Sequence, residues 1–197
     1  MKELKKDVWQ VLIDRMELRR ILSVKRNEEL RRQIETGEDL PDIDEAQILA
    51  MLEGTLANTS AFIEEAVQEV FEYLRPRNSR YKTNTEFEIG KGVILRWAIE
   101  TKCDGGFHVN SHREQMLRAV DNVFHALDGN GTIKAHRGPL IDAIEASCTG
   151  TGETAYFKFK CCRNHNLHLV FKRLDLVAKL NAVAGGMKLR GESGQKG

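Results

Sequence analysis

The chain has 197 residues, of which 41% are hydrophobic and 30% are charged. The 30 Lys and Arg residues nearly balance the 29 Asp and Glu residues, so the formal charge of +1 excludes attraction of the whole molecule to nucleic acid or to an anionic membrane. Its first residues, MKELKKDVWQ, are charged and lack the apolar stretch and small-residue cleavage site of a signal peptide. No apolar run approaches the ~20 residues of a membrane span, and the four cysteines are too few for a disulfide scaffold. We therefore expect a cytoplasmic protein with reduced thiols and no membrane contact.

The N-terminal segment has apolar residues at helical spacing. This spacing predicts one long helix from residue 2 to about residue 35, and Gly37 would end it. The helix is either an amphipathic arm folded on its own domain or a surface that forms a homodimer with a second copy. Its apolar stripe comprises Leu4, Val8, Val11, Leu18, Leu22, Leu30 and Ile34.

Two more helices are expected before residue 76. Apolar residues between positions 43 and 52 predict a short helix that ends near Gly54. Ser60 would cap a second helix, and Pro76 would end it because the residue before a proline is disfavoured in the α region.

The middle of the chain alternates strand and helix signals. Val93, Leu95, Trp97 and Ile99 alternate with other residues, which predicts a strand over residues 93–100, followed by a turn and a short return strand at 107–109. Ser111 and Glu114 have the spacing of a capping box at the start of a helix. Pro139 is expected at the first position of another helix.

A β-hairpin is predicted over residues 156–172. Apolar residues face one another if the loop is Asn164-His165-Asn166, with Cys161 opposite Leu169 and Phe159 opposite Phe171. On the other face Lys158 would lie opposite Lys172, a repulsive pair that needs either an acid of the acidic helices or a phosphate between its members. A last helix would stop at Gly185-Gly186.

These elements predict an α+β fold. A long N-terminal helix and a helical pair occupy residues 1–75. A small antiparallel sheet of two hairpins packed with helices occupies residues 76–186 and ends in a β-hairpin plus helix, and residues 187–197 form a flexible tail.

Several segments together resemble a bacterial domain of unknown function associated with phages and mobile elements. They are SVKRNEELRRQI, EVFEYLRPRNSRYKTNTEFEIGKGVIL, RAVDNVFHALDG and YFKFKCCRNHNLHLVFKRLDLVAKLN. The resemblance extends from about Trp9 to Gly186. It implies a setting in DNA metabolism, because members of the family are sometimes found alongside or fused to adenine-type DNA methyltransferases. Members often have Gly at the position of His165, which suits the positive φ of a hairpin turn.

Enzyme motifs are sparse. The chain has no glycine-rich turn after a strand, no Asp/Asn-Pro-Pro-aromatic tetrad and no P-loop, which argues against methyl transfer and nucleotide binding. Residues 128–133 imitate part of a calcium loop, but Ala126 and Arg137 occupy the first and last ligand positions, so we reject calcium. We predict no cofactor and no catalytic residue.

The segment CCRNHNLH resembles a soft metal cluster. The predicted hairpin sends Cys161 to the core, so only Cys162, His165 and His168 remain as candidate metal ligands. Three groups fall short of the four ligands of a structural zinc site, and we predict no metal.

Charge is segregated along the chain. Residues 33–74 contain eleven acids and no Lys or Arg, whereas residues 75–82 contain four bases and no acid, and residues 155–174 are again free of acids. Such blocks are either solvated faces or a surface for an anionic partner. The candidate nucleic-acid contacts are Arg75, Arg77, Arg80, Tyr81, Lys82 and Asn84 in the basic loop, and Lys158, Lys160 and Lys172 on the hairpin.

The sequence therefore favours a non-enzymatic, DNA-associated accessory module of phage or DNA-methyltransferase systems. Its partners would be DNA and a DNA methyltransferase or another phage protein. An alternative is a protein–protein adaptor or dimerisation domain that uses the long helix and the acidic block. A third is an unrecognised enzyme such as a nuclease.

Overall fold

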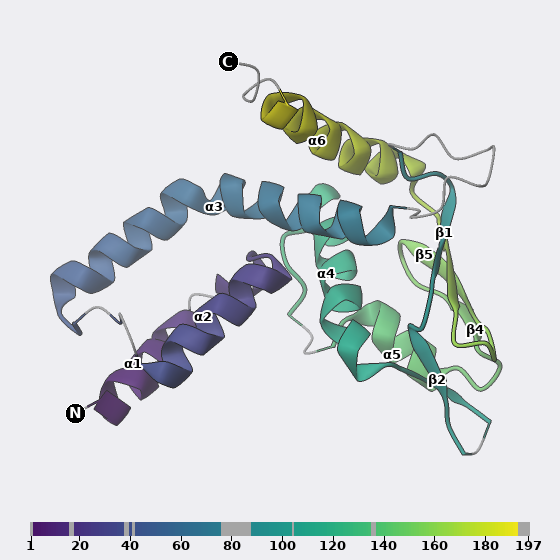
Figure 1. Cartoon of the computed structure of the whole chain (residues 1–197), viewed down its shortest axis with the longest axis horizontal. Helices are drawn as coiled ribbons and strands as arrows, with labels where there is room; N and C mark the ends of the chain where they lie inside the picture. Colours follow the sequence, from purple (N-terminus) through teal and green to yellow (C-terminus); the bar gives the residue numbers. More distant parts are fainter. Residues whose placement is uncertain are drawn as a thin grey trace. The chain divides into compact units, whose positions relative to one another are not determined.

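The computed structural model describes residues 2–15, 18–37, 40, 42–75, 88–103, 105–134 and 137–192 (Figure 1). Helices together with two small antiparallel sheets form the predicted α+β fold. The chain divides into two compact units, residues 1–66 and 67–197, and the division falls within helix α3 (Glu45–Leu74). Within the described ranges no helix is long and apolar enough to cross a membrane.

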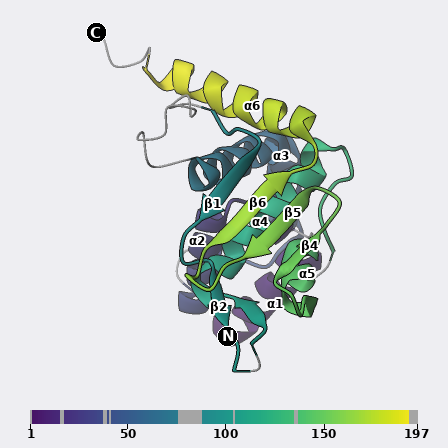
Figure 2. The same ribbon diagram turned by 90° about the vertical axis from the view of Figure 1, so that its right-hand side faces the viewer.

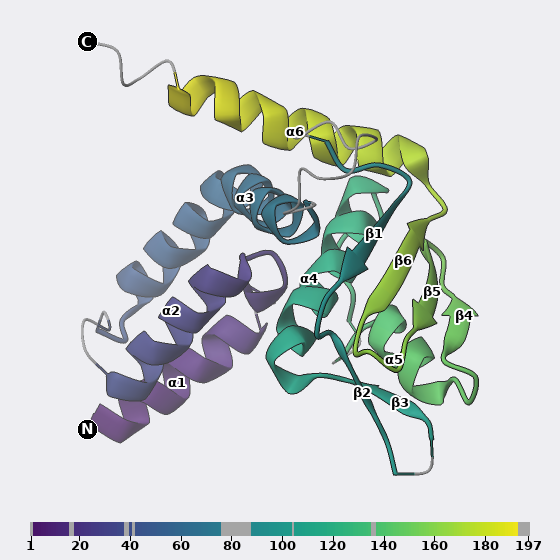
Figure 3. The same ribbon diagram turned by 45° about the vertical axis from the view of Figure 1, so that its right-hand side comes forward.

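The predicted long N-terminal helix is wrong, because the chain breaks it into three pieces. Helix α1 (Lys2–Arg15), a 3-10 turn η1 (Leu18–Arg20) and helix α2 (Val24–Thr36) follow one another, with α1 and α2 side by side (Figure 3). Ser23 caps α2 by accepting a hydrogen bond from the backbone of Arg26 at 3.2 Å. The reversal is stabilised because it lets Ile13, Leu22 and Ile34 share one buried core.

Gly37 ends helix α2, as predicted. It adopts a left-handed conformation with φ of 67°, which L side chains rarely take, and its N–H donates to the carbonyl of Gln33 at 2.9 Å.

Helix α3 is continuous, so the predicted end near Gly54 and the predicted cap at Ser60 are wrong. An isolated glycine weakens a helix by only about 1 kcal/mol. Burial outweighs that amount, because Met51 and Phe62, on either side of Gly54 and Ser60, pack against the core of the first unit. The helix ends at Leu74, in agreement with the predicted end before Pro76.

A four-stranded antiparallel sheet organises the second unit. Its strand order is β1 (Gly92–Leu95), β6 (Leu167–Phe171), β5 (Phe157–Cys161) and β4 (Thr151–Glu153). Helices α4 (Ser111–Leu127) and α5 (Pro139–Ala146) lie on one face of this sheet, and α6 (Leu174–Glu192) crosses one end of it (Figure 2).

The core between the sheet and α4 is aromatic. The ring of Phe124 stacks on that of Phe171 with centroids 5.5 Å apart and meets Phe157 edge-on at 4.9 Å. All three side chains are at most 2% exposed, so they anchor α4 to one face of the sheet.

The predicted strand over residues 93–100 is wrong, because the chain turns at Arg96 and Trp97. Strand β1 ends at Leu95, while β2 (Ile99–Thr101) pairs with β3 (Phe107–Val109) in a separate two-stranded sheet. The return strand at 107–109 is as predicted. The turn forms because the backbone N–H groups of Ala98 and Ile99 both donate to the carbonyl of His165, at 3.0 and 3.2 Å.

The hairpin β5–β6 exists and places its apolar residues on one face, but its predicted register is wrong. Cys161 lies opposite Leu167 rather than Leu169, and Phe159 lies opposite Leu169 rather than Phe171. The loop is Arg163-Asn164-His165, because Cys162 donates to the carbonyl of Asn166 at 2.9 Å. His165 takes the positive φ of this turn, 67°.

Lys158 accordingly does not pair with Lys172. It lies opposite Val170, and Lys160 lies opposite His168. A shift of two residues keeps every side chain on its face, so alternation of apolar and polar residues cannot distinguish the two registers.

Two helix ends also differ from the prediction. Asn110, not Ser111, caps α4 by accepting from the N–H of His112 at 2.9 Å, because the asparagine amide is as good a cap as a serine hydroxyl. Helix α6 continues through Gly185 and Gly186 to Glu192, since glycine weakens a helix without ending it and no proline follows. Helix α5 begins at Pro139, as predicted.

Candidate functional site

Within the second unit, one face of the four-stranded sheet is not covered by any helix that the structure describes (Figure 2). We call it the open face, and it carries the outward side chains of Ile94, Lys158, Lys160, His168 and Val170. Ile94, on the edge strand β1, is 58% exposed, and Val170, on the inner strand β6, is 41% exposed. The open face is therefore a surface with apolar and cationic groups mixed.

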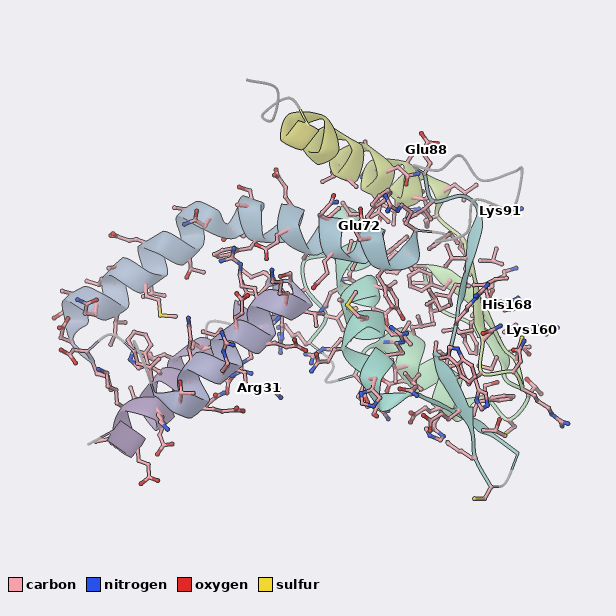
Figure 4. The ribbon with its side chains drawn as sticks, in the orientation of Figure 1. Arg31, Glu72, Glu88, Lys91, Lys160 and His168 are labelled. Carbon is pink, nitrogen blue, oxygen red and sulfur yellow. The ribbon has the colours of Figure 1, made fainter. Side chains whose placement is uncertain are left out.

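Lys160 occupies the middle of this face. Its strand neighbours are His168 on β6 and Thr151 on β4, and His168 in turn lies opposite Ile94 on β1. Figure 4 shows Lys160 and His168 on the side of the sheet away from α4. Within the described ranges Lys160 makes no ion pair, so its ammonium group is available to an external anion.

The other two predicted lysines share an acid. The Nζ atoms of Lys158 and Lys172 lie 4.0 and 3.6 Å from the same carboxylate oxygen of Glu153 on β4, and Lys172 also donates to the carbonyl of Thr154 at 2.8 Å. An intramolecular acid thus lies beside both lysines, although it comes from a neighbouring strand rather than from the acidic helices. These exposed pairs contribute little to stability, but they reduce the local positive charge.

A cluster of four residues lies where β1 turns into β2, beside the hairpin loop. We call it the turn cluster; it consists of Arg96 and Trp97 from the first turn and Arg163 and His165 from the second. The Trp97 and His165 rings stack with centroids 5.4 Å apart and planes inclined by 16°. Trp97 is nevertheless 65% exposed, and both arginines are exposed.

The backbone of the turn cluster is strained and is held by several hydrogen bonds. Trp97 and His165 are the non-glycine residues with positive φ among those described, at 56° and 67°. Such conformations cost on the order of 1–3 kcal/mol each and persist where the surroundings impose them. Here the carbonyl of His165 accepts hydrogen bonds from two backbone N–H groups. The Nδ1 atom of the His165 imidazole lies 3.1 Å from the carbonyl of Ile99.

Sequence reasoning missed Trp97. The alternation from Val93 to Ile99 placed it on the inward face of a continuous strand, and Arg96-Trp97 contains no residue typical of a turn. The hydrogen bonds that form the turn come from His165, far along the chain, so no local signal was available.

The predicted basic loop is described only at its first residue. Arg75 follows α3 and lies 3.3 Å from the carboxylate of Glu72, so it is already paired. The remaining candidates, Arg77, Arg80, Tyr81, Lys82 and Asn84, lie outside the described residues, and their contribution stays a prediction.

The three candidate metal ligands have other surroundings. His165 uses its ring to stack on Trp97 and bond to Ile99, His168 lies opposite Lys160, and Cys162 is half-buried at the loop. Burial raises the pKa of the neighbouring Cys161 thiol to about 12, so it stays protonated. Over the described ranges, no group of three His, Cys, Asp or Glu residues could hold a metal ion.

The segment that imitates a calcium loop is a helix end followed by turns on glycine. Gly129 and Gly131 have φ of 81° and 73°. The Asp128 carboxylate accepts from the hydroxyl of Tyr156 at 3.1 Å and pairs with Arg173 at 3.0 Å. This acid therefore ties the loop to the hairpin.

The geometry defines a class of protein, a small α+β domain with a helix-covered face and an open, cationic sheet face. Within that class, the sequence matches the family described as Domain of unknown function (DUF4942) over residues 1–189, and the chain belongs to this family. Neither the curated proteins nor the solved structures contain a match to the sequence.

Proposed function

We propose that the chain is a non-enzymatic, DNA-associated accessory module of phage or DNA-methyltransferase systems. The observation that carries the proposal is the open face of the sheet, with Lys160 at its centre and two exposed arginines, Arg96 and Arg163, at one end. The ammonium group of Lys160 has no ion-pair partner among the described residues. Phosphate contacts in protein–DNA complexes come mainly from such side chains. The basic loop, Arg77, Arg80 and Lys82, lies outside the described residues, and we expect it to supply further phosphate contacts.

The neutral composition agrees with a local contact surface. The formal charge of the chain is +1, so binding through long-range attraction of the whole molecule is excluded. DNA affinity must then depend on a few named cations, and each can be tested separately.

The test is fluorescence anisotropy with a labelled DNA across a salt series. Each phosphate contact adds about 0.9 to the slope of log affinity against log salt on duplex DNA, so neutralising Arg77, Arg80 and Lys82 together should lower the slope by roughly 2–3. Lys160→Gln should lower it by about 0.9. No binding by the wild-type protein at low salt would refute the proposal.

Lys158→Gln is the matched control for Lys160→Gln. The two lysines lie two positions apart on the same face of β5, but the ammonium group of Lys158 lies 4.0 Å from Glu153. Its neutralisation should change the salt slope less than that of Lys160. Equal slopes in the two variants would show that binding depends on net charge and not on this surface.

A second candidate function is a dimerisation or adaptor domain. It is favoured by apolar side chains left exposed on the first unit, Leu4 and Val11 on α1 and Leu49 and Leu56 on α3, which are 49–76% exposed. In each pair the residues are seven positions apart and lie on one face of their helix. Self-association that does not depend on salt would support this function.

A further inference from the structure

We propose that the Trp97–His165 stack in the turn cluster is a platform for an unpaired nucleobase, so that the preferred ligand of the open face is a single strand. This inference deepens the proposed function and depends on it for the phosphate contacts. It names a stacking residue and a ligand class that the basic residues alone do not specify.

The exposure of Trp97 is the first support. An indole in a folded domain is usually well buried, yet this one is 65% exposed although one of its faces is covered by the imidazole of His165 at 5.4 Å. The other face of the ring is therefore accessible. A nucleobase is a flat aromatic group that can stack on that free face.

The rigidity of the platform is the second support. Hydrogen bonds from Ala98 and Ile99 to the His165 carbonyl, together with the contact between its Nδ1 and Ile99, connect the two turns. The indole is thus held in place before any ligand arrives, in a left-handed backbone conformation that a tryptophan does not adopt without such support. Preorganised rings lose little entropy on binding, which favours affinity.

The neighbouring charges are the third support. Arg96 precedes Trp97, Arg163 is in the same loop as His165, and neither has an ion-pair partner among the described residues. A single strand can place a base on the indole while its phosphates reach these arginines and Lys160. Duplex DNA cannot do both, because its bases are stacked inside the helix.

The experiment compares an end-labelled oligothymidylate of about 15 nucleotides with a duplex of the same length, in anisotropy titrations of the full chain. The wild-type protein should bind the single strand more tightly. Trp97→Ala should weaken binding of the single strand by about 5- to 150-fold, leave the salt slope unchanged because stacking releases no ions, and leave duplex binding unchanged. Trp97→Phe, which keeps a ring, should retain most of the affinity.

His165→Gly tests the support under the indole. Glycine accepts the left-handed backbone of the hairpin loop and keeps the carbonyl that holds the turn, but it removes the imidazole from one face of the indole. Single-strand binding should therefore weaken, by less than in Trp97→Ala, while duplex binding should not change. If Trp97→Ala and His165→Gly weaken single-strand and duplex binding alike, the indole only holds the two turns together, and the inference is overturned.

Tryptophan emission gives a readout that does not depend on the folding of an alanine variant. Stacking of thymine on Trp97 should quench the emission of the wild-type protein, whereas the Trp97→Phe variant, which retains the 1%-exposed Trp9, should show no change. Unchanged wild-type emission at saturating oligothymidylate would overturn the inference.

The outcomes separate the inference from the proposed function. Salt-dependent binding of both DNAs without an effect of Trp97→Ala leaves the accessory-module proposal standing and refutes the platform. Binding of neither DNA refutes the proposed function. An oligouridylate of the same length identifies the source of the strand: tight, Trp97-dependent binding of RNA alone would support the platform and refute the association with DNA.

Discussion

The carboxylate of Asp121 on α4 accepts a hydrogen bond from the backbone N–H of Leu140, at 2.8 Å, in the first turn of α5. Asp121 is 1% exposed and Leu140 is fully buried. The bond provides an acceptor for an N–H group that has none within α5, because the first N–H groups of a helix lack an intrahelical partner. It thereby joins α4 to α5. Burial nevertheless raises the pKa of Asp121 to about 7, because the loss of hydration outweighs the bond to Leu140.

Asp121→Asn should change the pH dependence of stability. Because the folded pKa lies above the ordinary value of 3.8, the folded state keeps a proton that the unfolded state loses as the pH rises from 3.8 to about 7. The contribution of Asp121 to the free energy of unfolding is therefore fully present below this window and is lost across it, by at most about 4 kcal/mol. Asparagine can still accept from Leu140 but does not ionise.

Urea denaturation at a series of pH values measures this effect. The difference in free energy of unfolding between the variant and the wild type should grow as the pH rises through the window. Asp142→Asn, an exposed acid whose charge raises the pKa of Asp121, is the control and should reduce the pH dependence only slightly. Parallel pH curves for Asp121→Asn and the wild type would contradict the assignment.

The hairpin predicts that substitutions of two adjacent residues of β5 have very different effects on the free energy of unfolding. Phe159 is 4% exposed and its ring lies over Gly152, so Phe159→Ala should lower the free energy of unfolding by about 3–5 kcal/mol. Lys160→Ala, on the open face, should change it by less than about 0.5 kcal/mol. Similar small losses in denaturant melts of both variants would place Phe159 outside the core.

The continuity of α3 predicts that Gly54→Ala is stabilising. An added Cβ meets no atom within 4 Å, and alanine in a helix interior is favoured over glycine by roughly 0.5–1 kcal/mol. Gly37→Ala is the control, since its φ of 67° disfavours alanine by roughly 1–2 kcal/mol. Denaturant midpoints should move in opposite directions; a loss of stability in Gly54→Ala would indicate a helix end there.

Substitutions of the exposed apolar residues on α1 test whether the chain forms a homodimer. If Leu4 and Val11 bury against a second copy, light scattering should report a dimer for the full chain and a monomer for Leu4→Glu with Val11→Glu. Removing residues 1–36 should also give a monomer, or an insoluble product. A monomer at every concentration with the wild-type chain would refute the dimer.

Local chemistry was enough to determine several features of this protein. Pro139 starts a helix because its N–H would be unpaired there in any case, Gly37 ends one because it accepts a positive φ, and alternation along β5 and β6 fixes which side chains are buried. These signals also established the α+β class. For the candidate site they suggested Lys158, Lys160 and Lys172, but not Trp97, which stacks on His165 at the hairpin loop.

Only the tertiary structure decided the register of the hairpin, the break at Trp97 and the continuity of α3. A two-residue shift leaves the hydrophobic pattern unchanged, so the loop hydrogen bonds had to select Arg163-Asn164-His165. The turn at Trp97 depends on the carbonyl of His165, and the helix passes Gly54 because its flanking side chains bury against residues from α1 and α2. In each case the deciding contact joins residues far apart in the chain, which a local pattern does not contain.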